Sequence, residues 1–185
     1  MDYGAYISGY VDGEGCFTVS IRRRPTLRIG WEVRPSFSVG QREDRAQTLR
    51  ILREYFGCGE IRLSRRDRVL HYETRSISDL TERILPHFLK YPLLSEKQGD
   101  LERFIQICEI IGAGKHRTER GLQEIIALAL QMRSTTSRRA RMLKTILSKF
   151  EGEGIVYATS NRGKREVLSR TKGVTTGGLS QRGAR

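Results

Sequence analysis

The sequence predicts an α+β domain built on a four-stranded, mainly antiparallel sheet, with a helical C-terminal part. Two patterns support this fold class. Segments in which apolar and polar residues alternate, as they do in strands, occur in two pairs, and each pair follows a segment with apolar residues at helical spacing. Beyond the second pair the apolar spacing stays helical, so the later helices follow the sheet instead of alternating with its strands.

The expected elements have recognisable boundaries. Gly57 and Gly59 end the second helix, and Ser78 and Asp79 can cap the third. The expected order, αββαββα followed by further helices, is helix 2–12, strands 16–23 and 31–41, helix 44–56, strands 60–65 and 69–76, a helix ending near Leu89, and helices 96–112, 119–133 and 137–150.

The length of 185 residues suits one domain with a tail. We expect residues 1–158 to form that domain and residues 159–185 to form a basic, disordered tail, because the chain there becomes polar and rich in glycine, serine, threonine and arginine. Three cysteines match neither a zinc site nor a disulfide framework, which suits a reducing compartment. We see no signal peptide and no run of about 18 apolar residues, and therefore expect no membrane span.

The net charge is the strongest global signal. The chain has 34 lysines and arginines against 21 acidic residues, a formal charge of +13. Such a charge predicts a polyanionic partner, most often nucleic acid. A membrane surface is the alternative, but it would need a basic amphipathic helix with aromatic anchors. The excess of arginine over lysine has a second explanation in a GC-rich coding sequence, which favours a bacterial or phage protein of the cytoplasm and leaves an organellar source open.

One face of the expected sheet is predicted to be basic and to bind DNA. Strand rise, about 3.3 Å per residue, is close to the spacing of stacked bases, and a two-stranded ribbon fits the major groove. A merely soluble sheet surface is the alternative, although it would mix charges of both signs more evenly. The candidate DNA-binding residues are Arg22, Arg24, Arg28, Arg34, Arg62, Arg66, Arg68, Tyr72, Thr74 and Arg75.

The stretch ISGYVDGEG, residues 7–15, ends a helix with two acids. Gly13 and Gly15 are explained as a helix cap and a turn. Asp12 and Glu14 are not, because a carboxylate at a helix C-terminus is disfavoured by about 0.3–1 kcal/mol. A divalent cation would reverse the sign of this effect, since hard metals bind carboxylates, backbone carbonyls and phosphates.

Small residues on the same helix predict a close helix–helix contact. Ala5, Ser8 and Gly9 would let a second helix approach, although packing against the chain's own sheet explains them equally well. A symmetric pair of such helices would bring two copies of Glu14 together, and the two carboxylates would repel unless they shared metal.

ISGYVDGEG resembles the signature of the LAGLIDADG homing endonucleases at all nine positions, and the order of elements resembles that family over roughly residues 3–150. The resemblance implies that Glu14 and the carbonyl of Gly13 bind Mg²⁺, with Mn²⁺ able to substitute, and that Asp12 is structural at the helix end. It also implies catalytic roles for Gln41 and Arg45, in FSVGQREDR, and for Lys97, in LLSEKQGDL.

A single motif implies two chains. FEGEG, with Glu151 and Glu153, mimics the motif, but too few residues follow it to form a second sheet. The resemblance therefore implies a homodimer that makes double-strand breaks in a near-palindromic DNA site during intron or mobile-element homing. The predicted interface comprises Ala5, Ser8, Gly9 and Asp12. Two alternatives stay open on the same fold: a maturase that binds intron RNA, and a DNA-binding protein without catalysis.

Overall fold

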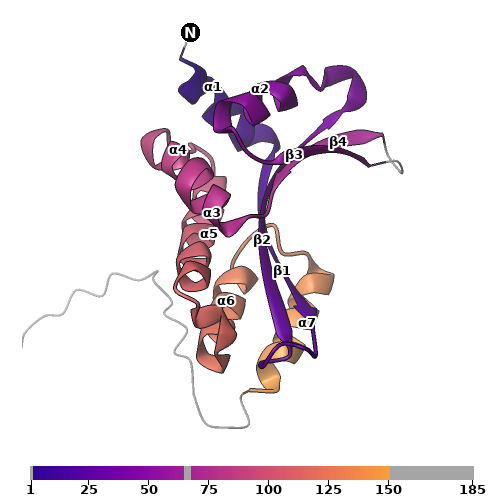
Figure 1. The fold of residues 1–185 in the computed structure, drawn as a ribbon, viewed down its shortest axis with the longest axis vertical. Coiled ribbons are helices and arrows are strands. Elements are labelled where there is room, and N and C mark those ends of the chain that lie inside the picture. The colour runs from indigo at the N-terminus through magenta and orange to yellow at the C-terminus, as the bar shows by residue number, and fades with distance from the viewer. Residues whose placement is uncertain (1, 65–67, 151–185) are drawn as a thin grey trace, which may run out of the picture. The chain divides into compact units, whose positions relative to one another are not determined.

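The computed structural model describes residues 2–64 and 68–150, and the predicted α+β order is confirmed (Figure 1). The predicted Arg66, the Glu151–Glu153 acid pair, the domain boundary at 158 and the basic tail lie outside the described residues. The sheet-forming half consists of α1 (Tyr3–Glu14), β1 (Gly15–Arg23), β2 (Trp31–Arg42), the 3₁₀ turn η1 (Glu43–Arg45), α2 (Gln47–Phe56), β3 (Glu60–Ser64) and β4 (Val69–Thr74).

The second half is helical, as expected. The helix predicted to end near Leu89 is interrupted by a π-helical turn. Pro86 lies just beyond this turn, and its ring and missing N–H are incompatible with regular α-helical bonding to the preceding turn. The elements are α3 (Ile77–Asp79), η2 (Leu80–Ile84), α4 (Leu85–Lys90), α5 (Lys97–Gly112), η3 (Lys115–Arg117), α6 (Glu119–Leu130) and α7 (Ser137–Ser148).

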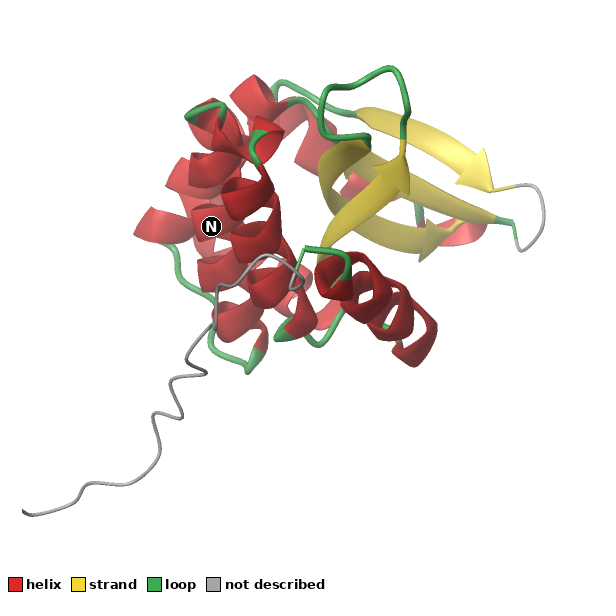
Figure 2. Ribbon diagram, turned by 90° about the horizontal axis from the view of Figure 1, so that it is seen from below, coloured by secondary structure: helices red, strands yellow, loops and turns green. Residues whose placement is uncertain are grey.

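The four strands are antiparallel and follow the order β1-β2-β4-β3. Phe17 pairs with Phe37, and Val39 pairs with Tyr72, so these side chains share one face of the sheet. Figure 2 shows most of the helices gathered on one side of this sheet. Because successive side chains point to opposite faces, the other face carries the polar residues of every strand and stays open.

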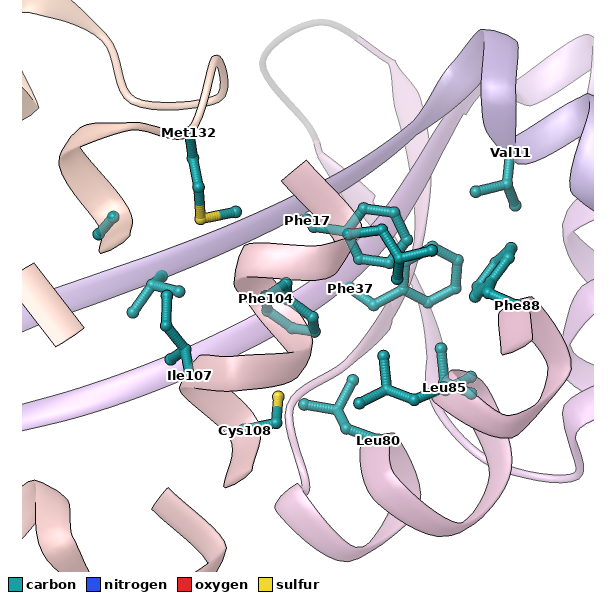
Figure 3. Packing of buried hydrophobic residues seen from close by; sticks show 14 of the residues in the cluster. Val11, Phe17, Phe37, Leu80, Leu85, Phe88, Phe104, Ile107, Cys108 and Met132 are labelled. Carbon is teal, nitrogen blue, oxygen red and sulfur yellow. The ribbon is translucent and has the colours of Figure 1, made fainter. Parts of the chain in front are cut away.

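An aromatic cluster attaches the helices to the sheet (Figure 3). The ring of Phe17 lies 5.1 Å from that of Phe37 and 5.3 Å from that of Phe104, and Phe37 lies 5.7 Å from Phe88. All four side chains are buried. Aromatic pairs at these distances add to the burial of apolar area and hold α4 and α5 against β1 and β2. Within the described ranges, no helix is both long and apolar enough to cross a bilayer.

Candidate active site and nucleic-acid surface

The motif helix α1 delivers its acids to the start of β1. Asp2 caps the helix by accepting a hydrogen bond from the Gly4 N–H at 2.9 Å. At the other end the Gly15 N–H donates to the carbonyl of Val11. A Cβ on Gly15 would lie 2.5 Å from Val11 Cγ1 and 2.7 Å from its carbonyl oxygen, so only glycine allows the chain to pass directly from helix to strand.

Asp12 is structural, as the helix-end prediction implied. Its carboxylate accepts hydrogen bonds from the N–H groups of Leu94 and Ser95, both at 3.0 Å, and from the Ser95 hydroxyl. Burial raises the pKa of Asp12, but the hydrogen bonds from Ser95 and Leu94 outweigh it and leave the pKa below its ordinary value. These bonds tie the end of α1 to the segment that leads into α5. The assignment of Asp12 to the dimer interface stays a prediction.

Glu14 has the opposite surroundings. Its side chain is exposed, and within residues 2–64 and 68–150 no group forms a hydrogen bond or ion pair with its carboxylate. Gly13 is also exposed, and a Cβ there would meet nothing within 4 Å. The carboxylate and the neighbouring backbone are therefore open to an external ligand.

Lys97, at the first residue of α5, lies beside this helix end. Its ammonium Nζ donates at 2.9 Å to the carbonyl of Val11, which also accepts the Gly15 N–H, and places a positive charge at the C-terminal end of α1. Burial lowers the pKa of Lys97, and the carboxylates of Asp12 and Glu14 partly oppose that lowering. A pocket of about 650 Å³ opens here, and it is lined by Asp12, Gly13, Gly15, Cys16, Phe17, Leu94, Ser95, Glu96, Lys97, Asp100, Arg133 and Ser134.

Gln41 and Arg45 lie outside the set of residues that lines this pocket. Gln41, near the end of β2, bonds to the hydroxyl of Tyr10 on α1, as Thr48 does. Burial raises the pKa of Tyr10, and these two hydrogen bonds oppose the rise. Arg45, in η1, is exposed and forms no ion pair with the described part of the chain. The structure thus brings Glu14 and Lys97 together and leaves Arg45 apart from them.

Most of the residues that line this pocket were missed by sequence reasoning. Arg133 and Ser134 belong to the loop after α6, which was expected to be helical to residue 133. The helix ends earlier because the buried Asp100 accepts a hydrogen bond from the Arg133 N–H at 3.0 Å. Arg133 also pairs with Glu96. The hydrogen bond between Asp100 and Arg133 could not be predicted from the local sequence, because it joins positions 33 residues apart.

The small residues of α1 divide between two faces. Ser8 faces inward: its hydroxyl donates to the carbonyl of Tyr91 at 2.6 Å and lies 3.1 Å from His87 Nε2. Its prediction as an interface residue is therefore wrong. Ala5 and Gly9 are exposed, and a Cβ on Gly9 would meet nothing within 4 Å. With Gly13, these residues form an exposed stripe of small residues at i, i+4 and i+8.

His87 is a buried histidine with a defined tautomer. Ser8 uses its only proton on Tyr91, so it accepts the Nε2–H of His87, and His87 Nδ1 accepts from the Tyr55 hydroxyl at 3.0 Å. Burial lowers the pKa of His87 to about 4, and the imidazole is neutral at physiological pH. This chain of hydrogen bonds connects α1 to α2 and α4.

The open face of the sheet mixes charges of both signs. This face was predicted to be basic, but most of its arginines pair with carboxylates within the sheet or beside it. The pairs are Arg24 and Arg34 with Glu32, Arg62 with Glu60, Arg75 with Glu73, and Arg68 with Glu43. Arg22 and Arg28 are exposed and form no ion pair with any residue that the structure describes.

Tyr72 and Thr74 are not DNA-binding candidates. Both side chains are buried, with exposed fractions of 0% and 2%. The Tyr72 hydroxyl donates to the carbonyl of Cys58 at 3.1 Å and accepts from the Thr74 hydroxyl at 3.3 Å. Residues two apart on a strand share a face, and on β4 that face is the one packed on the core.

Comparison with known proteins identifies the family. A model of the LAGLIDADG endonuclease family matches residues 7–108. "Probable intron-encoded endonuclease 2" of Neurospora crassa is 35% identical over 123 residues, 66% of this chain and 27% of that protein. Homing endonuclease I-ApeII of Aeropyrum pernix is 27% identical over 147 residues, 77% of this chain and 86% of its own length.

Solved structures agree with the sequence matches. The homing endonuclease I-TnaI superposes with a TM-score of 0.73 at 35% identity, covering 80% of this chain and 99% of that chain. I-SmaMI bound to an uncleaved DNA target in the presence of calcium ions gives 0.74 at 31% identity, covering 80% of this chain and 50% of that chain.

Several relatives are longer than this chain, and their origin differs from the bacterial or phage source that the sequence predicted. The chain spans about a quarter of the length of three fungal relatives, and half of I-SmaMI. Relatives from Neurospora crassa and Mycosarcoma maydis are described as intron-encoded, so the expected bacterial or phage source gains no support from them. The matched motif, the αββαββα order and the structural superpositions together show that this chain belongs to the LAGLIDADG endonuclease family.

Proposed function

We propose that the chain is a site-specific DNA endonuclease that hydrolyses phosphodiesters with Mg²⁺ held at Glu14. The observation that carries this proposal is the contrast at the end of α1: Asp12 is fully engaged, whereas Glu14 is exposed, without a partner among the described residues, and beside the pocket that contains Lys97. A protein gains nothing in stability from a free carboxylate at a helix C-terminus. An external cation bound to this carboxylate would explain its position.

The donor set fits a metal shared between molecules. In the described part of the chain, no three histidine, cysteine or acidic side chains group as metal ligands. Glu14 and the Gly13 carbonyl therefore supply only part of a shell, and substrate phosphates and a second copy of Glu14 would complete it. When bound, Mg²⁺ or Mn²⁺ supplies an activated water and stabilises the leaving oxygen.

The neighbouring polar residues have distinct roles in this proposal. The half-buried ammonium of Lys97 stabilises negative charge that develops on the phosphate oxygens. Gln41, bonded to Tyr10, orients water without titrating, and Arg45 contacts phosphate when DNA is bound.

Association through α1 supplies the second half of the site. The exposed stripe of Ala5, Gly9 and Gly13 lets an identical helix approach closely, and a two-fold axis there brings two Glu14 side chains together. Such a homodimer prefers a near-palindromic site of about twenty base pairs, because each sheet follows one half-site. The open sheet face binds the DNA through Arg22, Arg24, Arg28, Arg34, Arg62, Arg68 and Arg75.

The test begins with selection of cleaved duplexes from a randomised pool in the presence of Mg²⁺. On the selected site, Glu14→Gln should abolish cleavage and keep affinity within about threefold, because amide and carboxylate are nearly isosteric. Glu124→Gln, which replaces an exposed acid on α6, is the matched control and should cleave like the parent. Cleavage retained by Glu14→Gln would disprove the metal assignment.

A further inference from the structure

We propose that the outer face of α7 is a second binding surface for the backbone of duplex DNA, separate from the sheet. The proposal rests on the endonuclease function above for the identity of the polyanion. It concerns a helix to which the LAGLIDADG signature assigns no role, and which lies beyond the residues 7–108 matched by the family model.

The first observation is an imbalance of charge. Residues 125–150 contain no aspartate or glutamate, yet they include six lysines and arginines. Only one of the six, Arg133, forms an ion pair within the described ranges. The arginines of the sheet are mostly neutralised by neighbouring carboxylates, whereas the cations of α7 are not. Helix α7 therefore carries more unpaired cations than the strands of the sheet do, among the residues that the structure describes.

The second observation is the arrangement of these cations. Arg138, Arg141 and Lys144 are exposed and separated by three residues each, so neighbouring cations are close on the helix surface. Like charges at this spacing disfavour a helix by about 0.2–0.5 kcal/mol per pair. Arg138 is also in the first helical turn, which contains no acidic residue, at the end where the helix dipole favours anions. The arrangement costs stability in the free protein, and a row of phosphates would reverse that cost.

The third observation is the position of α7. Helix α7 lies beside β1, which is an edge strand of the sheet (Figure 1). Arg139 lies near the Cys16 thiol at the start of β1. Near the other end of β1, Lys149 lies 6.0 Å from the centre of the Trp31 ring. The loop before α7 lines the pocket that contains Lys97, so DNA that enters this pocket and crosses the sheet passes beside the helix.

A lipid surface fits α7 less well. Leu143 and Ile146, on its apolar side, are buried in the core and cannot enter a membrane. The helix also has no aromatic residue between positions 137 and 148 to anchor it at a headgroup layer. Duplex DNA requires only the outer cations, which remain free, and a regular row of phosphates is the complement of a row of cations.

The experiment measures affinity for a random-sequence 30-base-pair duplex against KCl concentration, without Mg²⁺. The triple variant Arg138→Gln/Arg141→Gln/Lys144→Gln should bind more weakly and lower the slope of log affinity against log salt by about 2 to 3, or about 0.9 per lost phosphate contact. Its thermal midpoint should stay equal or rise, because helical like-charge repulsion is removed.

The matched control removes the same charge elsewhere. Arg50→Gln/Arg53→Gln/Arg120→Gln replaces three exposed arginines on α2 and α6 and should leave the salt slope within about 0.5 of the parent. An equal loss in both triple variants, an unchanged slope in the α7 variant, or a loss confined to structured RNA or anionic vesicles would each overturn the proposal. Failure of Mg²⁺-dependent cleavage in the parent would overturn the endonuclease function alone, because this assay measures only binding.

Discussion

At the scale of single residues, Asp12 and Glu14 show how position decides the role of a carboxylate. The two acids are separated by one glycine, yet Asp12 accepts three hydrogen bonds from the segment before α5 and Glu14 accepts none from the described residues. Because Asp12 holds the helix end in place, Glu14 can remain unpaired without leaving the local backbone loose. The hydrogen bonds of Asp12 thus hold the backbone that positions Glu14.

His87 gives a pH prediction. Its folded pKa of about 4 lies below the ordinary value of 6.5, so the unfolded chain binds a proton that the folded chain does not between these pH values. Stability from this group is fully present above pH 6.5 and is lost as the pH falls toward 4. We expect a loss of up to about 3 kcal/mol in the free energy of unfolding, measured by urea denaturation.

The control for this prediction is His87→Gln, which keeps polar groups in the same place but does not titrate. Its free energy of unfolding should be lower at neutral pH and should change less between pH 6.5 and 4 than that of the parent. Identical pH profiles for the two proteins would show that other groups govern acid unfolding.

Side-chain direction on β4 shows where sequence reasoning failed at this scale. Thr74 and Arg75 are adjacent, so their side chains must lie on opposite faces of an extended chain, and they could not both bind DNA. The alternation was visible in the sequence, but its phase was not. Only the pairing of Tyr72 with Val39 places the Tyr72–Thr74 face on the core.

At the scale of elements, α1 packs on its own sheet through one side and leaves the other side free. The two sides differ in whether they have room for a side chain larger than that of glycine. A Cβ on Gly4 would lie 2.3 Å from the ring of Tyr91, whereas a Cβ on Gly9 would meet nothing. The same residue type thus serves internal packing at one position and leaves an open surface at the other.

This difference predicts opposite effects for two glycine substitutions. Gly4→Ala should destabilise the fold by about 1–3 kcal/mol, because the methyl group overlaps Tyr91. Gly9→Leu should leave the thermal midpoint of the monomer nearly unchanged but weaken the proposed dimer at least tenfold, as measured by sedimentation equilibrium. A Gly9→Leu protein that still forms dimers of parental affinity would contradict association through this helix.

The elements themselves were predicted well, because their signals are local. Apolar periodicity and turn residues lie within each segment, and the αββαββα order was confirmed. The faces of α1 were harder to predict, since Ser8 and Gly9 are equally small and only the distant His87 and Tyr91 distinguish the inner from the outer residue. The catalytic assignments of Gln41 and Arg45 depend on bound DNA and stay predictions.

At the scale of the whole molecule, a net charge of +13 is distributed unevenly. The open sheet face interleaves arginines with Glu32, Glu60 and Glu73, which hold the guanidinium groups in place and reduce non-specific attraction. Under the proposed function, an arginine must leave its carboxylate to contact a base, which penalises sequences that offer it no good contact.

Glu32 provides a test of this view. Glu32→Gln removes the partner of both Arg24 and Arg34, so we expect about three- to tenfold tighter binding to random duplex and a smaller preference for the selected site. Competition binding with specific and random duplexes measures both quantities. An unchanged preference would mean that these pairs have no part in recognition.

The contact between Lys97 Nζ and the Val11 carbonyl has a consequence during synthesis of the protein. It joins positions 86 residues apart, so a nascent chain exposes its acidic motif long before the lysine leaves the ribosome. The proposed hydrolytic centre can assemble only after the sheet has been translated and α5 has begun to emerge. A truncated product that ends before α5 would carry the whole signature motif but lack the lysine that the proposed centre requires.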